Sequence, residues 1–270
     1  MGLVLICVGL LGYKVLFSHY SLASIVPISA FDVHTSLRFE GHEGTVRVRT
    51  FLPRSDRRQR VGSEVFGPSD LTKVEEVKGP NRIITWRAES LTGPRTLSID
   101  YRVWAPVLRY ELPADVRIAR ELPENMQQFL APTATIQSDS PEIAALLDRL
   151  APRPRTLKNT LQAIFTYTHH DIEPMPFKGT TDALTALRLG QGSCTGKSRL
   201  FAALARHAGL PTRLVGGLIL NPGSKRTSHQ WVETWINGQW VPFCPLNEHF
   251  AEIPAQYLRL YTGDEALFTH

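Results

Sequence analysis

A cysteine stands where the sequence predicts the first turn of a helix. Cys194 follows the segment Gly190-Gln-Gly-Ser, and apolar residues recur after it at helical spacing until Gly209 and Pro211 end the pattern. A helix N-terminus carries partial positive charge and unpaired N–H groups, which favour a thiolate over a thiol and can stabilise an oxyanion. Local sequence leaves two interpretations open: Cys194 is a reactive nucleophile, or it is a buried and inert thiol.

A histidine and a second cysteine are predicted to meet on one face of a β-hairpin. Asn237-Gly238 lies between two apolar runs and signals a two-residue type I′ turn, and counting outward from this turn pairs Trp231 with Cys244. Side chains alternate along strands, and paired residues point the same way. His229 therefore lies diagonal to Cys244, roughly 7 to 8 Å away between backbones, within reach of a side-chain contact.

Together these segments resemble the transglutaminase-like superfamily of papain-type cysteine enzymes. The resemblance covers about residues 138–254, with the cysteine helix at Gly192-Ser-Cys194 through Arg213 and the histidine hairpin at His229 to Pro245. It implies an α+β fold, in which a helix carrying Cys194 packs on an antiparallel sheet carrying His229. It also implies that Cys194 is the nucleophile and that His229 is its base.

Residue 244 departs from the family pattern. The family has an aspartate here that orients the histidine, and this chain has Cys244. Loss of such a carboxylate can cost about 10⁴ in rate, because it fixes the histidine tautomer at Nδ1 and stabilises the imidazolium. Asn247 is a candidate substitute, although strict alternation places it on the other face unless Pro245 bends the strand. We expect no disulfide between Cys194 and Cys244, since they would flank the imidazole on opposite sides.

The N-terminal segment from Leu3 to Phe17 is almost entirely apolar. It is long enough to span a membrane if Lys14 snorkels and the segment continues through Ala23. A cleaved signal peptide is the alternative, because residues 21–23 have the form of a cleavage site. Both interpretations place the rest of the chain outside the cytosol. We expect a single-pass anchor over residues 1–24 in the inner membrane, with the remainder in the periplasm.

Three further segments follow the anchor. Residues 25–122 are expected to form a small β-rich module, either a sheet or a sandwich, in which 31–39 and 45–51 form a hairpin around Gly41-His-Glu-Gly44, and strands at 82–88 and 96–104 are separated by Gly93-Pro94. The transglutaminase-like domain follows at 123–255, with helices expected at 143–150, 157–167 and 181–189. Residues 256–270 are expected to be a C-terminal tail, complete or truncated.

Other kinds of site find little support. Thr195-Gly-Lys-Ser198 resembles the end of a phosphate-binding loop, but that motif needs glycine where Gln191 stands. His169, His170 and Asp171 could bind a metal, yet adjacent histidines point in different directions and no other ligand cluster lies nearby in sequence. The net charge of +5 is weak support for an acidic partner. We therefore expect no metal, no cofactor and no nucleic acid partner.

Two functions from different classes remain. The apolar N-terminus, the β-rich module and the Phe-Cys-Pro variant at Cys244 resemble a bacterial group of inactive transglutaminase-like domains fused to seven membrane helices. This resemblance implies a catalytically impaired sensor, scaffold or peptide-binding module, whose partners are a peptide or envelope polymer, the membrane, and a polytopic membrane domain or protein. The alternative is an active thiol acyltransferase or peptidase with Cys194 as nucleophile and His229 as base. The feature that distinguishes the two functions is residue 244 together with its candidate substitute, Asn247.

Overall fold

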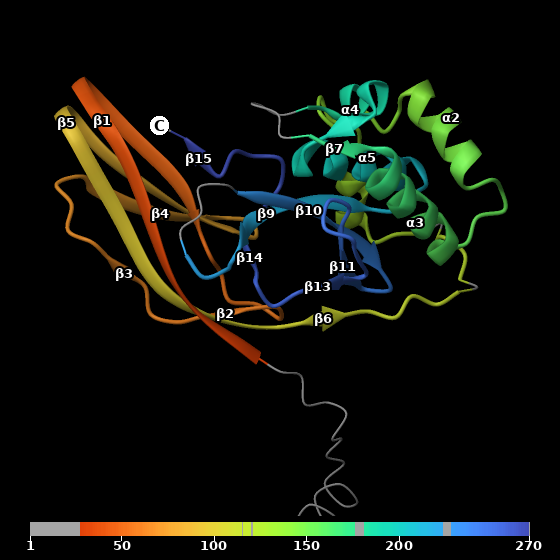
Figure 1. Cartoon of the computed structure of the whole chain (residues 1–270), viewed down its shortest axis with the longest axis horizontal. Helices are drawn as coiled ribbons and strands as arrows, with labels where there is room; N and C mark the ends of the chain where they lie inside the picture. Colours follow the sequence, from red (N-terminus) through yellow and green to blue (C-terminus); the bar gives the residue numbers. More distant parts are fainter. Residues whose placement is uncertain (1–27, 115, 120, 176–180, 224–227, 270) are drawn as a thin grey trace, which may run out of the picture.

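The computed structural model describes residues 28–114, 116–119, 121–175, 181–223 and 228–269. The expected membrane anchor at 1–24 lies outside these residues, and among the described residues no helix is long and apolar enough to cross a membrane. The described chain forms a strand-rich unit beside an α+β unit (Figure 1).

The strand-rich unit is built on two very long strands, β1 (Ile28–Leu52) and β5 (Asn81–Pro106), which pair antiparallel along almost their whole length (Figure 1). Short strands complete this six-stranded sheet: β2 (Arg60–Val61), β3 (Val65–Phe66), β4 (Thr72–Lys78) and β15 (Phe268–Thr269). The expected β-rich region is confirmed, as one sheet rather than a sandwich.

The glycine pair at 41 and 44 does not reverse the chain. We expected a hairpin turn there and a break at Gly93-Pro94, and both expectations are wrong, because Gly41 pairs with Gly93 inside two continuous strands. Register shifts on either side of Gly44 mark a β-bulge, and Glu43 has a φ of 54°. A Cβ on Gly41 would lie 2.5 Å from the carbonyl oxygen of Leu91. Gly41 therefore allows the two strands to approach each other closely at a bend. Glycine is as typical of such a bend as of a turn, so the sequence pattern alone does not separate the two.

The α+β unit contains a five-stranded antiparallel sheet. Its order is β12 (His249–Phe250), β11 (Gln239–Cys244), β10 (His229–Ile236), β9 (Thr212–Ile219) and β14 (Tyr257–Thr262). The main helices are α2 (Pro141–Leu150), α3 (Leu157–Thr166), α4 (Ala183–Leu189) and α5 (Cys194–His207). Short elements complete the unit and its connection: β6 (Leu108–Arg109), β7 (Glu173–Pro174), β8 (Gln191–Gly192), β13 (Glu252–Ile253), a 3-10 helix η2 (Glu124–Phe129) and a π-helical turn η3 (Tyr167–Asp171). The expected α+β class is confirmed.

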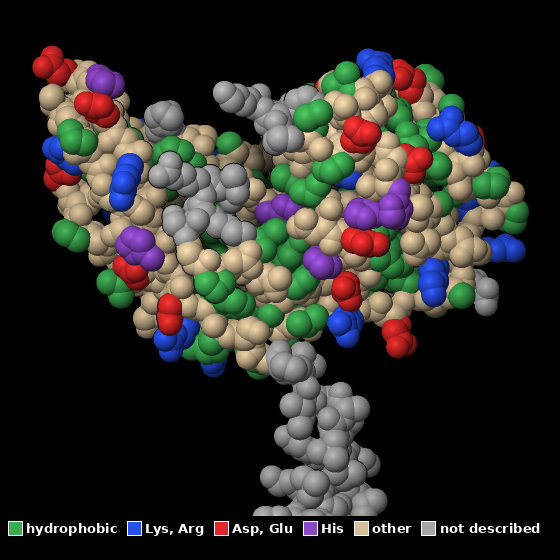
Figure 2. All heavy atoms as spheres, in the orientation of Figure 1, with side chains coloured by type: hydrophobic (Ala, Val, Ile, Leu, Met, Phe, Trp, Pro, Cys, Tyr) green, Lys and Arg blue, Asp and Glu red, His purple; other side chains and the backbone are tan. Residues whose placement is uncertain are grey.

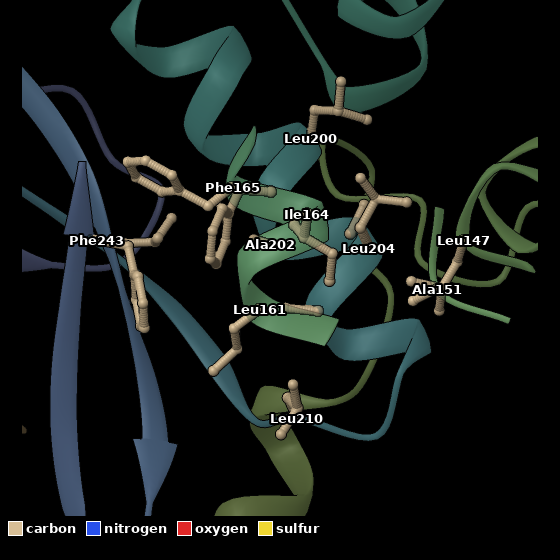
Figure 3. Close-up of a cluster of buried hydrophobic side chains, with 14 of the residues drawn as sticks. Leu147, Ala151, Leu161, Ile164, Phe165, Leu200, Ala202, Leu204, Leu210 and Phe243 are labelled. Atoms are coloured by element: carbon tan, nitrogen blue, oxygen red, sulfur yellow. The ribbon is translucent and has the colours of Figure 1, made fainter. Parts of the chain in front are cut away.

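Helix α5 lies in the centre of the hydrophobic core between the other helices and the sheet. Leu200 through Ala205 are all fully buried, so this helix is covered on every side. Figure 3 shows Leu200, Ala202 and Leu204 of this helix among side chains of α2 and α3, with Phe243 of β11 at the sheet side. This packing fixes α5 against β10, so the expected arrangement of a cysteine helix on a histidine sheet is confirmed.

The C-terminal segment, which we expected to be a tail, belongs to both units. β14 pairs with β9 in the α+β sheet, and β15 pairs with β1 in the other sheet. Leu258, Leu260 and Tyr261 enter the hydrophobic core of the strand-rich unit. Sequence patterns did not reveal this, because both strands are short and pair with strands far away along the chain. The expected boundary between the two units at residues 122 and 123 stays a prediction.

Buried polar groups join the two units along β14. The side-chain amide of Gln59 donates to the Arg259 carbonyl at 2.9 Å and accepts from the Arg259 N–H at 2.9 Å. Asn81 makes the same pair of bonds to the backbone of Thr262, at 2.9 and 2.8 Å. Such reciprocal bonds satisfy buried groups on both partners, so they fix the position of β14 as well as adding stability.

A buried ionic cluster completes the junction. Glu233 is fully buried in β10 and pairs with Arg213 of the neighbouring strand at 2.7 Å and with Arg58 of the strand-rich unit. Arg259 of β14 pairs with Asp56. Burial alone would raise the pKa of Glu233, but the charges of Arg58, Arg213 and Arg259 outweigh it and hold that pKa below its ordinary value. Glu233 therefore stays ionised in the interior.

Candidate active site

Cys194 is the first residue of α5, and its thiol is free and partly exposed. Ser193 precedes it as the N-cap, and the Ser193 hydroxyl accepts a hydrogen bond from the N–H of Gly196. The sulfur therefore lies at the end of the helix that carries partial positive charge, where the first N–H groups have no partner within the helix. The sequence-predicted position at a helix N-terminus is confirmed.

His229 begins β10 and is only 7% exposed. Its ring stacks on Trp231, with centroids 6.2 Å apart and planes at 21°, and it packs against the Tyr257 ring at 83°, with centroids 5.4 Å apart. Across the sheet His229 pairs with Gly217, where any Cβ would overlap the carbonyl oxygen of Leu258. The glycine thus lets β14 approach closely, which brings Tyr257 against the imidazole.

Cys244 ends β11 with its Sγ 3.2 Å from Nε2 of His229, so the contact that the hairpin register predicts is confirmed. Asn237 and Gly238 have φ values of 47° and 85°, as a type I′ turn requires, and the pairing outward from them is the predicted one. Our expectation that residue 244 faces Nδ1 is wrong. Strand alternation fixes which way the imidazole points, but it does not fix the rotation of the ring.

Burial decides the protonation of Cys244. The side chain is fully buried, and this raises the pKa of its thiol to about 11, although N–H groups of Asn247 and Leu246 and the Tyr257 hydroxyl favour the thiolate. The proximity of Cys194 adds slightly to this increase. At neutral pH Cys244 is therefore a thiol. A thiol can donate to Nε2 or accept from it, whereas a carboxylate only accepts, so Cys244 does not fix the tautomer of His229.

Comparison with protein families identifies this part of the chain. Residues 144–245 match the transglutaminase-like superfamily. This stretch is a transglutaminase-like domain. No curated protein matches the chain.

Among solved structures, the chain is similar to a proposed cysteine protease from Cytophaga hutchinsonii, at 18% identity and a TM-score of 0.73, over 91% of this chain and 87% of the other. At this identity the likeness shows the fold alone. The periplasmic domain of TgpA from Pseudomonas aeruginosa, bound to ethylmercury, has 16% identity and a TM-score of 0.40, over 82% of this chain and 75% of the other. A proposed protease from Parabacteroides distasonis has 13% identity and a TM-score of 0.36, over 87% and 48%.

Asn247 reaches the site of the transglutaminase-like domain through a tyrosine. Its Nδ2 donates to the hydroxyl of Tyr257 at 2.7 Å, and that hydroxyl donates to Sγ of Cys244 at 3.7 Å. Burial raises the pKa of Tyr257, so the hydroxyl keeps its proton and remains a donor. Sequence reasoning missed Tyr257, because it lies in the segment that we expected to be a tail. The roles of Cys194, His229, Cys244 and Asn247 stay predictions.

A buried lysine connects α5, the helix that begins with Cys194, to the end of β11. Lys197 follows Cys194 by almost one helical turn, and its Nζ donates to the carbonyl of His169 at 2.8 Å. Nδ1 of His169 then bonds the carbonyl of Pro245 at 2.7 Å. Burial lowers the pKa of Lys197. Residues three apart in a helix lie on the same side of it, so the spacing of Cys194 and Lys197 is the sequence signal that could have revealed Lys197.

A cleft of about 760 Å³ lies between the two units, and Ser228, the residue before His229, lines it. Figure 2 shows the surface hollowed between the strand-rich unit and the helix-bearing unit. Its other walls come mainly from β1 and from the end of β9 with the residues that follow it, and β5, β14 and β15 also contribute; Phe31, Leu218 and Leu220 are among the apolar residues. The transglutaminase-like domain thus has a mostly apolar depression beside its histidine.

Proposed function

We propose that the transglutaminase-like domain is a thiol site of strongly reduced catalytic power, which binds a peptide or an envelope polymer as a sensor or scaffold. One observation carries this proposal: a buried thiol with a pKa of about 11 stands 3.2 Å from Nε2 of His229. When His229 takes the proton of Cys194, the neutral thiol of Cys244 supplies no negative charge to the imidazolium that forms. The loss of such a carboxylate costs about 10⁴ in rate in comparable triads.

The second candidate function is an active thiol acyltransferase or peptidase. Cys194 at the N-terminus of α5 supports it, because the helix end favours the thiolate and offers N–H groups to an oxyanion. In this reaction the sulfur attacks an amide carbon, His229 delivers a proton to the leaving amine, and an acyl-enzyme forms. Water or an amine then releases the acyl group and restores the thiol.

We also propose that the domain lies in the periplasm on a single inner-membrane anchor, with a polytopic membrane protein or domain as partner. The apolar run from Leu3 to Phe17 supports this placement. In isolated spheroplasts, protease added outside should cleave the chain beyond Asp32 while the N-terminal segment stays in the membrane fraction. A mature protein that starts at Ser24 and is released from the membrane would instead identify a signal peptide.

The catalytic proposal is tested with the full chain in detergent. An activated acyl probe should label Cys194, as mapped by mass spectrometry, and should fail to label this position in Cys194→Ala. Turnover of an activated ester should stay within about tenfold of the Cys194→Ala background, because the orienting carboxylate is missing. Labelling with turnover about 10³-fold above that background would establish the active enzyme instead. Absence of labelling would refute a thiol site altogether.

A further inference from the structure

Three side chains with metal-binding atoms meet beside the transglutaminase-like site. His169 and His170 come from η3, and Glu248 comes from the turn after β11; their ligand atoms all lie within 4.8 Å of one another. His170 and Glu248 are exposed and His169 is partly buried. On the visible face of the α+β unit, histidine side chains lie next to acidic ones (Figure 2).

His169 is held in the tautomer that binds metals. Its Nδ1 lies 2.7 Å from the carbonyl oxygen of Pro245, which can only accept, so Nδ1 carries the hydrogen. The lone pair is then on Nε2, which faces Glu248 with 3.8 Å between Nε2 and Oε2. A backbone carbonyl that orients the distal nitrogen of a histidine is the usual support of a metal ligand.

The backbone around these residues is held in unusual conformations. Residues 167–171 form a π-helical turn, a feature found frequently at functional sites. A π-helix rotates less per residue than an α-helix, so the side chains of neighbouring residues diverge less. The two imidazole rings are accordingly 4.5 Å apart. Glu248 has a φ of 55°, in the left-handed region that costs a residue with a side chain. His169 is also fixed by Lys197 at its carbonyl and by Phe165 stacked on its ring.

We propose that His169, His170 and Glu248 bind a divalent transition-metal ion, with Zn²⁺ as the best match. Two imidazoles and one carboxylate suit Zn²⁺ and its neighbours, whereas Ca²⁺ and Mg²⁺ prefer oxygen ligands throughout. Three protein ligands at an exposed position leave room for water on the ion. This site replaces our expectation of no metal: the two rings do not diverge, and the third ligand arrives from a segment far along the chain.

Metal binding is measured on the full chain in detergent, in a Cys194→Ser background that removes the partly exposed thiol as a competing ligand. Titration against a chromophoric zinc indicator should give about one ion per chain. His170→Ala and Glu248→Gln should each weaken binding by about tenfold or more, since each removes a ligand from an exposed position where the fold does not depend on it. Co²⁺ should give visible absorption bands in the Cys194→Ser chain and lose them in both variants.

His34→Ala is the matched control, because His34 is an exposed histidine beside Asp100 on the strand-rich unit and belongs to no such cluster among the described residues. Its zinc affinity should equal that of the Cys194→Ser chain. The proposal fails if His170→Ala and Glu248→Gln bind zinc as tightly as the control, or if no ion binds. Neither outcome depends on thiol reactivity, so this test stands apart from that of the proposed function.

Discussion

The buried thiol of Cys244 lies beside the imidazole of His229 in surroundings that suit a charged group better than a neutral one. Hydrogen-bond donors surround its sulfur: the N–H groups of Leu246 and Asn247 and the hydroxyl of Tyr257 all favour the thiolate form of Cys244. Burial nevertheless keeps the thiol protonated. The surroundings of residue 244 are thus those of an acceptor, while the residue itself is neutral at physiological pH.

Cys244→Asp should raise activity at this site. An aspartate would accept the Nε2 hydrogen of His229 and use the same donors for its second oxygen, so the correct tautomer and the imidazolium would both be stabilised. We expect kcat/KM for an activated ester to rise by about 10² or more. Cys244→Ser, which adds no charge, should show no such rise.

Two other results would contradict this account of Cys244. Unchanged low activity in Cys244→Asp would mean that the groove is blocked or that Cys194 is misplaced. Loss of substantial wild-type activity would mean that Cys244 already orients His229, together with Asn247. The double variant with Cys194→Ala sets the background for both comparisons.

Asn247 should act only through Tyr257. The amide contacts the tyrosine hydroxyl at 2.7 Å, and the hydroxyl contacts Cys244. In the Cys244→Asp background, Asn247→Ala and Tyr257→Phe should therefore each lower kcat/KM by a few fold, about 1 kcal/mol for one hydrogen bond. The double variant should be no slower than Tyr257→Phe. Additive losses would instead show that Asn247 contacts the reacting groups independently.

At the scale of elements, locally encoded structure was predictable and long-range pairing was not. The Asn237-Gly238 turn sets its own register, and this alone brings His229 to Cys244. Helix α5 is likewise encoded by its own apolar spacing and its terminal glycine. By contrast, the pairing of β14 with β9 depends on contacts between distant segments, so Tyr257 carried no local signal. The bulge at Gly44 was mistaken for a turn because glycine is common in both.

Glu233→Gln should strongly destabilise the junction between β10, β9 and the strand-rich unit. Arg213 and Arg58 would lose their buried negative partner, and breaking such a pair costs about 3–5 kcal/mol. Unfolding by urea, followed by circular dichroism, measures this loss. Glu142→Gln breaks an exposed pair with Arg188 and should leave stability nearly unchanged.

The same carboxylate predicts a pH dependence. The folded-state pKa of Glu233 lies below the ordinary value of 4.5, so its contribution is fully present above that value and is lost as pH falls through the folded pKa. Between about pH 5 and about pH 3, the wild type should lose more unfolding free energy than Glu233→Gln. Equal losses in the two proteins would contradict the lowered pKa.

At the scale of the whole molecule, the two units share one C-terminal segment. Leu258, Leu260 and Tyr261 bury their side chains in the strand-rich core, while the backbone of β14 completes the sheet of the other unit. Each such side chain contributes about 1.5–3 kcal/mol. Together they are comparable with the entire stability of many domains.

A chain that ends at Ala255 should therefore fail to reach the native state. Near-ultraviolet circular dichroism and the thermal transition should both be lost, because β14 is missing from both units. A chain that ends at Glu265 is the control, since it keeps β14 and the Arg199 ion pair with Asp264 and loses only residues 266–270, with the β15 pairing and the contacts of Leu267 and Phe268. It should retain a cooperative transition at a lower Tm. A cooperative transition in the Ala255 chain would show that the units fold without their shared strand.

The pairing of the last strand with the first also governs when the protein can fold. Arg49 of β1 bonds Glu265, which is 216 residues later, and β15 pairs with the same end of β1. The entropy cost of closing so large a loop must be met before these contacts form. During synthesis the N-terminal strands therefore emerge long before the residues that complete their sheet. The nascent chain therefore stays open to proteases and chaperones until β15 has been made.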